Sequence, residues 1–178
     1  NKEYEAANEY YNKLCSINDN IKYEYYQLIS KIMNSSESNS YDLKDLKKLV
    51  SVIDLIIIDD KAFVKEDYLS ITDYNNEITY IYFDYIKKLY NNNPYKIRND
   101  ISQYVEEVIK IEEKSKKIIE PYIDDKEEYK EIYCTTLQNM VMLYAHICKK
   151  GYYFVINDEK RNNYIKKYGK YVEEIKRI

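Results

Sequence analysis

Apolar residues recur at steps of three and four along almost the whole chain. In the stretch 129–151 they fall at Tyr129, Ile132, Tyr133, Leu137, Met140, Val141, Tyr144, Ile147 and Cys148. This spacing places them on one face of an α-helix. Between positions 140 and 148 further apolar residues fill the flanks, so most sides of this helix must be covered by other helices. We therefore expect 129–151 to be the central rod of a helical bundle.

Residues that interrupt helices are scarce. The chain has only two glycines and two prolines in 178 residues, far below average usage. Tight strand turns and phosphate-binding loops both depend on glycine. The composition thus predicts an all-α fold without a sheet, a bundle of five to six long and mostly antiparallel helices in a single domain over 1–178.

The apolar spacing predicts further helices over about 2–33, 61–90, 97–122 and 157–178, and one between Ser40 and Asp59. Asn18 interrupts the first row, where we favour one continuous helix with a polar core position that sets the register. The alternative is a break at 18–20, because Asn and Asp compete for their own backbone. Asn75 interrupts the row of 61–90 in the same way, and the segment Thr72 to Asn76 is polar enough to hold a kink. Ser40 is the expected N-cap of the helix that ends near Asp59, with Asp42 inside its first turn.

Tyrosine is the compositional anomaly, with 24 Tyr against 3 Phe and no Trp. Richness in Lys, Asn, Ile and Tyr is typical of an AT-rich genome, such as that of an apicomplexan parasite, a large DNA virus or some bacteria. Tyrosine is also enriched at protein interfaces, where it offers a large contact area and a polar tip. Six tyrosines lie off the main apolar rows and either cover a second face of the bundle or are exposed to a partner: Tyr10, Tyr23, Tyr26, Tyr74, Tyr80 and Tyr90.

The C-terminal segment is basic. From position 149 onward nine Lys and Arg face four Asp and Glu, a charge of +5, which leaves −8 for residues 1–148 since the total is −3. A basic helix with tyrosines could bind nucleic acid or an anionic membrane surface. The other interpretation is a solvated helix face with its tyrosines, Tyr168 among them, turned into the core. The candidate anion-binding residues are Lys160, Arg161, Lys166, Lys167 and Lys170.

No constellation of catalytic or metal-binding residues stands out. His146 is the only histidine, and the three cysteines, Cys15, Cys134 and Cys148, include no CxxC pair. At most one disulfide can form, from Cys15 to one of the other two, because the other two lie about 20 Å apart on one helix. Paired carboxylates such as Glu112-Glu113 are expected to be solvated, with i, i+4 partners at Lys116 and Lys117. We predict no enzyme activity, no cofactor and no metal.

The segment 42–94 is similar in helix lengths, and in its Asn-Pro stop, to the PHIST family of exported parasite domains. That family is recognised by its tryptophans, which this chain lacks, so we infer no membership. No apolar run is long enough for a membrane span. The chain starts without Met, so its beginning does not define a compartment. We expect a non-enzymatic helical module that binds another protein, secreted or exported to act on a host, and the alternative is binding of nucleic acid or an anionic surface.

Overall fold

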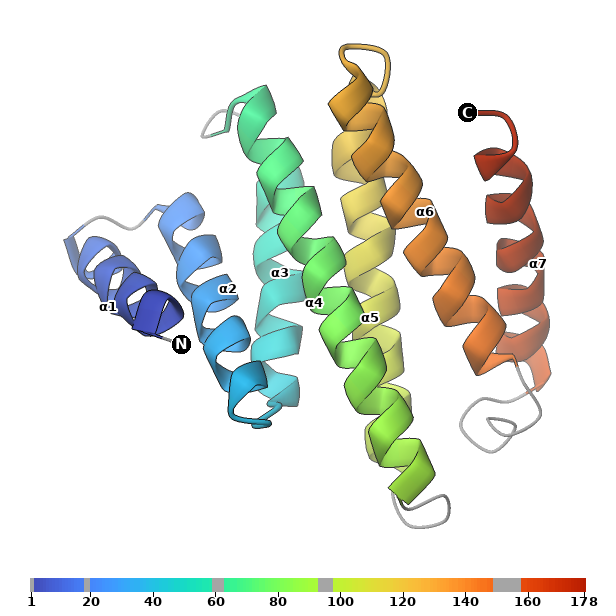
Figure 1. Ribbon diagram of the computed structural model, residues 1–178, viewed down its shortest axis with the longest axis horizontal. Helices are drawn as coiled ribbons and strands as arrows, with labels where there is room; N and C mark the ends of the chain where they lie inside the picture. Colours follow the sequence, from blue (N-terminus) through green and yellow to red (C-terminus); the bar gives the residue numbers. More distant parts are fainter. Residues whose placement is uncertain (1, 18–19, 59–62, 93–97, 149–157) are drawn as a thin grey trace. The chain divides into compact units, whose positions relative to one another are not determined.

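The computed structural model describes residues 2–17, 20–58, 63–92, 98–148 and 158–178. These residues form seven α-helices and a short 3-10 helix, with no strand among them (Figure 1). The predicted all-α bundle is confirmed, with slightly more helices than the five to six expected. The helices fall into two compact units, 1–68 and 69–178, which we describe separately. The prediction of one domain over the whole chain remains a prediction.

The first unit contains α1 (Lys2–Ile17), α2 (Ile21–Glu37) and α3 (Leu43–Ile58), and α2 packs against both of the others. The continuous first helix that we favoured is wrong, and the alternative break at 18–20 is right. Asn20 is the N-cap of α2, because its side-chain oxygen accepts a hydrogen bond of 2.9 Å from the backbone N–H of Lys22. An Asn that binds its own neighbouring backbone starts a new helix.

The core of this unit lies between α2 and α3. Its largest fully buried side chains are Tyr25, Ile32, Met33, Leu46, Leu49, Ile53 and Ile56. The N-cap of α3 is Asp42, whose Oδ1 accepts from the backbone N–H of Lys44 at 2.8 Å. The expectation that Ser40 would be this cap is therefore wrong, since the helix begins at Leu43.

The second unit contains most of α4 (Lys65–Asn92), then α5 (Arg98–Ile119), the 3-10 helix η2 (Glu120–Tyr122), α6 (Glu127–Ile147) and α7 (Asp158–Ile175). Helix α6 packs against both α5 and α7. Leu137 and Tyr144 of α6 are completely buried, as a central rod requires. Chain direction alternates between successive helices of this unit (Figure 1). Gly151, expected at the end of the rod, lies outside the described residues.

Polar side chains inside the second unit join α4 to α5. Helix α4 continues through 72–76, and Nδ2 of Asn75 donates to Oγ of Ser115 at 3.0 Å. Both side chains are fully buried. The Asn that interrupts the apolar row therefore serves as a paired core residue. Further along the same interface the ring of Tyr82 stacks on Tyr104, with centroids 5.9 Å apart.

Helix α7 packs on α6 through tyrosines. Tyr164 and Tyr171 are buried against Tyr144, with ring centroids 5.2 and 6.0 Å from it. Tyr168, predicted to face inward, is instead 38% exposed, and Ile165 next to it is also exposed. Both side chains lie beside a hollow between α6 and α7, so α6 covers them only in part.

Candidate functional site

A shallow groove lies between α4 and α6 in the second unit, lined by polar residue types that present mostly their apolar atoms. It has a volume of about 380 Å³, and we call it the α4–α6 groove. Its lining residues are Asp73, Asn76, Glu77 and Tyr80 from α4 with Thr135 and Asn139 from α6. The four α4 residues follow one another at steps of three, one and three, which places them on one side of the helix. Helix periodicity thus gathers two carboxylates, an amide and a phenol at one place.

The rim of the groove is acidic. Asp73 and Glu77 are exposed, one turn apart, and neither forms an ion pair with any residue that the structure describes. Partial burial and the neighbouring Asp73 carboxylate raise the pKa of Glu77 above its ordinary value. Like charges at i, i+4 destabilise a helix unless a cation comes between them. Tyr80, 63% exposed, stands at the end of this pair.

The floor of the groove is a fixed amide network. Asn76 is only 5% exposed, and its Oδ1 accepts from Oγ1 of Thr136 at 3.1 Å and from Nδ2 of Asn139 at 3.4 Å. The single hydrogen of the Thr136 hydroxyl is shared, because Oγ1 also lies 3.0 Å from the backbone oxygen of Ile132. The Nδ2 of Asn76 is itself buried and has no acceptor among the described residues. A buried donor left without an acceptor is destabilising by about 1–3 kcal/mol.

Glu112 of α5 lies behind this floor and is completely buried. Its Oε1 accepts from Nδ2 of Asn139 at 2.9 Å, and its Oε2 has no hydrogen-bond partner among the described residues. Burial raises the pKa of this carboxyl to about 8, although the Asn139 amide and the nearby Thr79 hydroxyl favour the charged form. The Thr79 hydroxyl is close to the carboxyl but does not reach regular hydrogen-bond geometry. At neutral pH, Glu112 is therefore mainly the uncharged acid.

The prediction that the Glu112-Glu113 run is solvated and paired with Lys116 and Lys117 is wrong for Glu112. Lys116 instead contacts Glu120 at 2.8 Å and Glu174 of α7 at 3.0 Å, and is itself nearly buried. The i, i+4 spacing alone predicts a surface ion pair, because it does not show which side of α5 faces α4 and α6. The helical spacing did indicate burial of Glu112, because it lies four residues after the buried Val108 and three before the buried Ser115, on the same side of α5.

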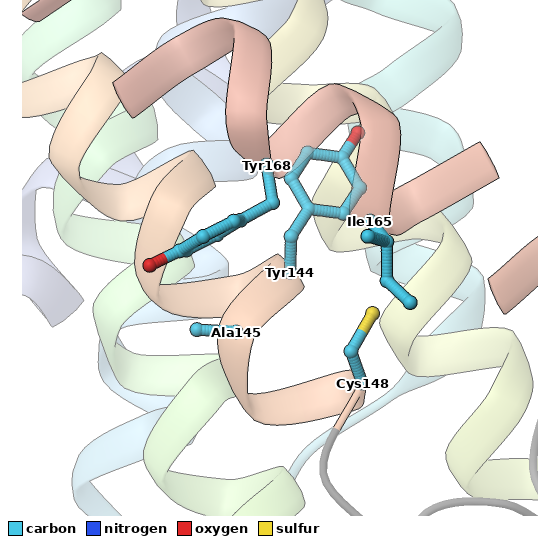
Figure 2. Close-up of a pocket in the computed structure, with 5 residues that line it drawn as sticks. All are labelled: Tyr144, Ala145, Cys148, Ile165 and Tyr168. Carbon is cyan, nitrogen blue, oxygen red and sulfur yellow. The ribbon is translucent and has the colours of Figure 1, made fainter. Parts of the chain in front are cut away.

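A second hollow, apolar and of about 350 Å³, lies between α6 and α7 (Figure 2). Tyr144, Ala145 and Cys148 of α6 and Ile165 and Tyr168 of α7 line it. In Figure 2 the Cys148 thiol points toward Ile165. Burial raises the pKa of this thiol, and its Sγ lies 4.0 Å from the backbone oxygen of Arg161. A protonated, partly buried thiol is a poor nucleophile.

The tyrosines singled out from the sequence are scattered. On α4, Tyr80 is strongly exposed and Tyr74 is moderately exposed, and their six-residue separation directs them to different sides of the helix. Tyr23 and Tyr26 belong to the first unit and are half-buried, and the Tyr26 ring stacks on Tyr11 at 5.6 Å. The side chain of Tyr90 lies outside the described residues. Among these tyrosines, Tyr80 lines the α4–α6 groove.

The candidate anion-binding residues of α7 are partly engaged inside the unit. Lys160 pairs with Glu106 of α5 at 2.6 Å, and Lys167 pairs with Glu113 of α5. Lys170 lies over the ring of Tyr171, at 5.9 Å from its centroid, and Arg161 is half-buried. Lys166 is exposed. The +5 charge of the sequence segment is therefore partly neutralised by α5, which sequence position alone does not show.

The remaining sequence candidates are placed as follows. His146 is half-buried, with its ring edge-to-face against Phe83 at 5.0 Å. Cys134 and Cys148 are free thiols, and the Cys15 side chain lies outside the described residues. Within the described ranges, no three His, Cys, Asp or Glu side chains are grouped as metal ligands. Within the same ranges, no helix combines the length and hydrophobicity that crossing a membrane requires.

Comparison of the chain with protein-family models, with curated proteins and with solved structures gave no match. The function therefore has to be argued from the geometry of the site.

Proposed function

We propose that this protein is a non-enzymatic helical module that binds a partner protein at the α4–α6 groove. The observation that carries the proposal is the exposure of Tyr80, 63% of whose surface faces solvent beside the groove. An exposed aromatic ring at the edge of a concave surface is typical of protein interfaces, because its burial releases water and restricts few side-chain torsions.

The chemistry of the groove supports binding over catalysis. The exposed groups are two carboxylates, a phenol, a threonine hydroxyl and amide groups, with no activated nucleophile beside a base. Glu112, which has a carboxyl of strongly shifted pKa, is fully buried behind the floor and does not line the groove. We also propose a secreted or host-facing role. Its support is the richness in Lys, Asn, Ile and Tyr, which is typical of proteins from the AT-rich genomes of parasites and large viruses.

The proposal is tested by capture of partners with a matched pair of tyrosine variants. Tyr80→Ala removes the groove ring, and Tyr10→Ala removes a tyrosine of similar exposure, 59%, from the first unit. Each immobilised protein is incubated with lysates of the cells that produce it and of host cells, and retained proteins are identified by mass spectrometry. We expect at least one protein to be retained by wild type and by Tyr10→Ala but lost with Tyr80→Ala. Equal retention of every captured protein by wild type and Tyr80→Ala would contradict the proposal.

Binding of nucleic acid or an anionic surface by α7 is the weaker candidate, because Lys160 and Lys167 already pair with α5 carboxylates. We expect no electrophoretic shift of a 30-base single strand or duplex, and no pelleting with phosphatidylserine vesicles, at physiological salt. Phosphate contacts depend steeply on salt, so the measurement is repeated at low ionic strength. Salt-dependent binding that is lost in Lys166→Glu/Lys170→Glu would favour the alternative function instead.

A further inference from the structure

We infer that the second unit binds an internal water molecule at the junction of α4, α5 and α6, among the side chains of Asn76, Thr79 and Glu112. The inference goes beyond the proposed function, because the site lies inside the helical packing and out of reach of a partner. It is carried by three buried polar atoms that have no hydrogen-bond partner among the described residues. They are Nδ2 of Asn76, Oγ1 of Thr79 and Oε2 of Glu112.

One side chain of α6 brings two of these groups together. Nδ2 of Asn139 lies 3.4 Å from Oδ1 of Asn76 and donates to Oε1 of Glu112 at 2.9 Å. The amide of Asn76 and the carboxyl of Glu112 therefore approach the same nitrogen, one from α4 and the other from α5. Thr79 follows Asn76 by three residues on the same side of α4. Its hydroxyl is close enough to the Glu112 carboxyl to favour the charged form, so all three groups belong to one polar cluster.

The burial of this cluster indicates a further ligand. Thr79 and Glu112 are completely buried, and Asn76 is nearly so. Buried polar groups of folded proteins are almost always paired with protein atoms or with ordered water. Elsewhere between α4 and α5 the pairing is direct, since Nδ2 of Asn75 donates to Oγ of Ser115 at 3.0 Å. The polar atoms around Glu112 lack such a direct partner among the residues that the structure describes.

Water suits the cluster because it can both donate and accept hydrogen bonds. The carboxyl of Glu112 donates when it is protonated and accepts when it is charged, and the Thr79 hydroxyl does both. The inward end of the Asn76 amide is a donor as placed, and would be an acceptor if the amide were turned over. One water molecule can satisfy these groups in either case. A cation suits them less well, because Glu112 is mainly the uncharged acid at neutral pH.

Water is also small enough for a site without an opening to solvent. Asn76 and Asn139 line the α4–α6 groove, and Asn139 contacts Glu112 behind it. A single layer of side chains thus separates the cluster from the groove. Exchange of the water through this layer requires local opening of the packing. We therefore expect the bound water to stay in place for much longer than the protein takes to tumble.

A crystal structure of the full chain at atomic resolution tests the site directly. We expect a density peak for one water oxygen at about 2.7–3.2 Å from both Oε2 of Glu112 and Oγ1 of Thr79. A direct hydrogen bond between these two side chains, with no such peak beside them, would overturn the inference.

Oxygen-17 relaxation dispersion tests the site in solution, because it detects long-lived internal water and is insensitive to exchange of hydroxyl or carboxyl protons. The variant Thr79→Val/Glu112→Met replaces two partners of the water by apolar side chains of similar size. Its matched control is Thr135→Val/Glu131→Met, the same changes at exposed positions of α6. The dispersion amplitude should fall by the contribution of one water in the first variant and keep its wild-type value in the control. An equal amplitude in wild type and the first variant would contradict the inference, and if that variant does not fold, the crystal structure decides.

Discussion

Replacing Glu112 with glutamine is expected to stabilise the protein, and to do so more strongly as the pH rises from 4.5 to 8. The carboxyl of Glu112 has its pKa raised by burial to about 8, against an ordinary value of 4.5. Between these values the unfolded chain has lost a proton that the folded protein keeps. The free energy of unfolding of wild type therefore falls by about 1.4 kcal/mol per pH unit through this window, and levels off above the folded pKa.

Glutamine keeps the shape of the side chain and an oxygen that can accept from Asn139, but it does not titrate. Urea unfolding at several pH values should show similar stabilities for Glu112→Gln and wild type near pH 4. Near pH 7 the variant should be more stable by about 3 kcal/mol. Glu131→Gln, at an exposed position of α6, is the control and should follow wild type at every pH. Parallel curves for Glu112→Gln and wild type would show that the carboxyl is charged in the folded protein.

Tyr144→Ala is expected to destabilise the second unit by about 3–5 kcal/mol, the range for removal of a large buried aromatic side chain. Tyr144 is completely buried, and its ring contacts Tyr164 and Tyr171 of α7. Its hydroxyl donates to Oε1 of Glu113 at 2.9 Å. The same carboxylate also binds Lys167 of α7. One residue of α6 thus holds α7 by ring packing and α5 by a hydrogen bond.

Tyr144→Phe separates these two contributions, because it removes the hydroxyl and keeps the ring. We expect a loss of only about 1 kcal/mol, since Glu113 keeps its lysine partner. Urea unfolding gives both free energies, and hydrogen exchange should show faster exchange of α7 amides in Tyr144→Ala alone. Equal losses in the two variants would mean that the hydrogen bond to Glu113 of α5, and not ring packing against α7, accounts for the contribution of Tyr144.

The residues of the candidate site were only partly predictable. Tyr80 was singled out because it lies off the apolar rows of its helix, and the structure places it at a groove. Asn76 was seen only as part of a polar interruption of α4, because its role depends on Thr136 and Asn139, some 60 residues further along the chain. Glu112 was assigned to the surface because charged residues are rarely buried. Such pairings between distant segments are invisible to local spacing.

What the sequence determined by itself is the all-helical class, the amphipathic rows and the positions of most helices, because these follow from periodicity and from the scarcity of glycine and proline within one segment at a time. Tertiary structure alone decided which polar residues became core and which charges were neutralised. Asn75 meets Ser115, and Lys167 meets Glu113, across 40 and 54 residues of chain. Burial and pairing depend on what the neighbouring helix presents, and that is a property of the packing, which no single segment encodes.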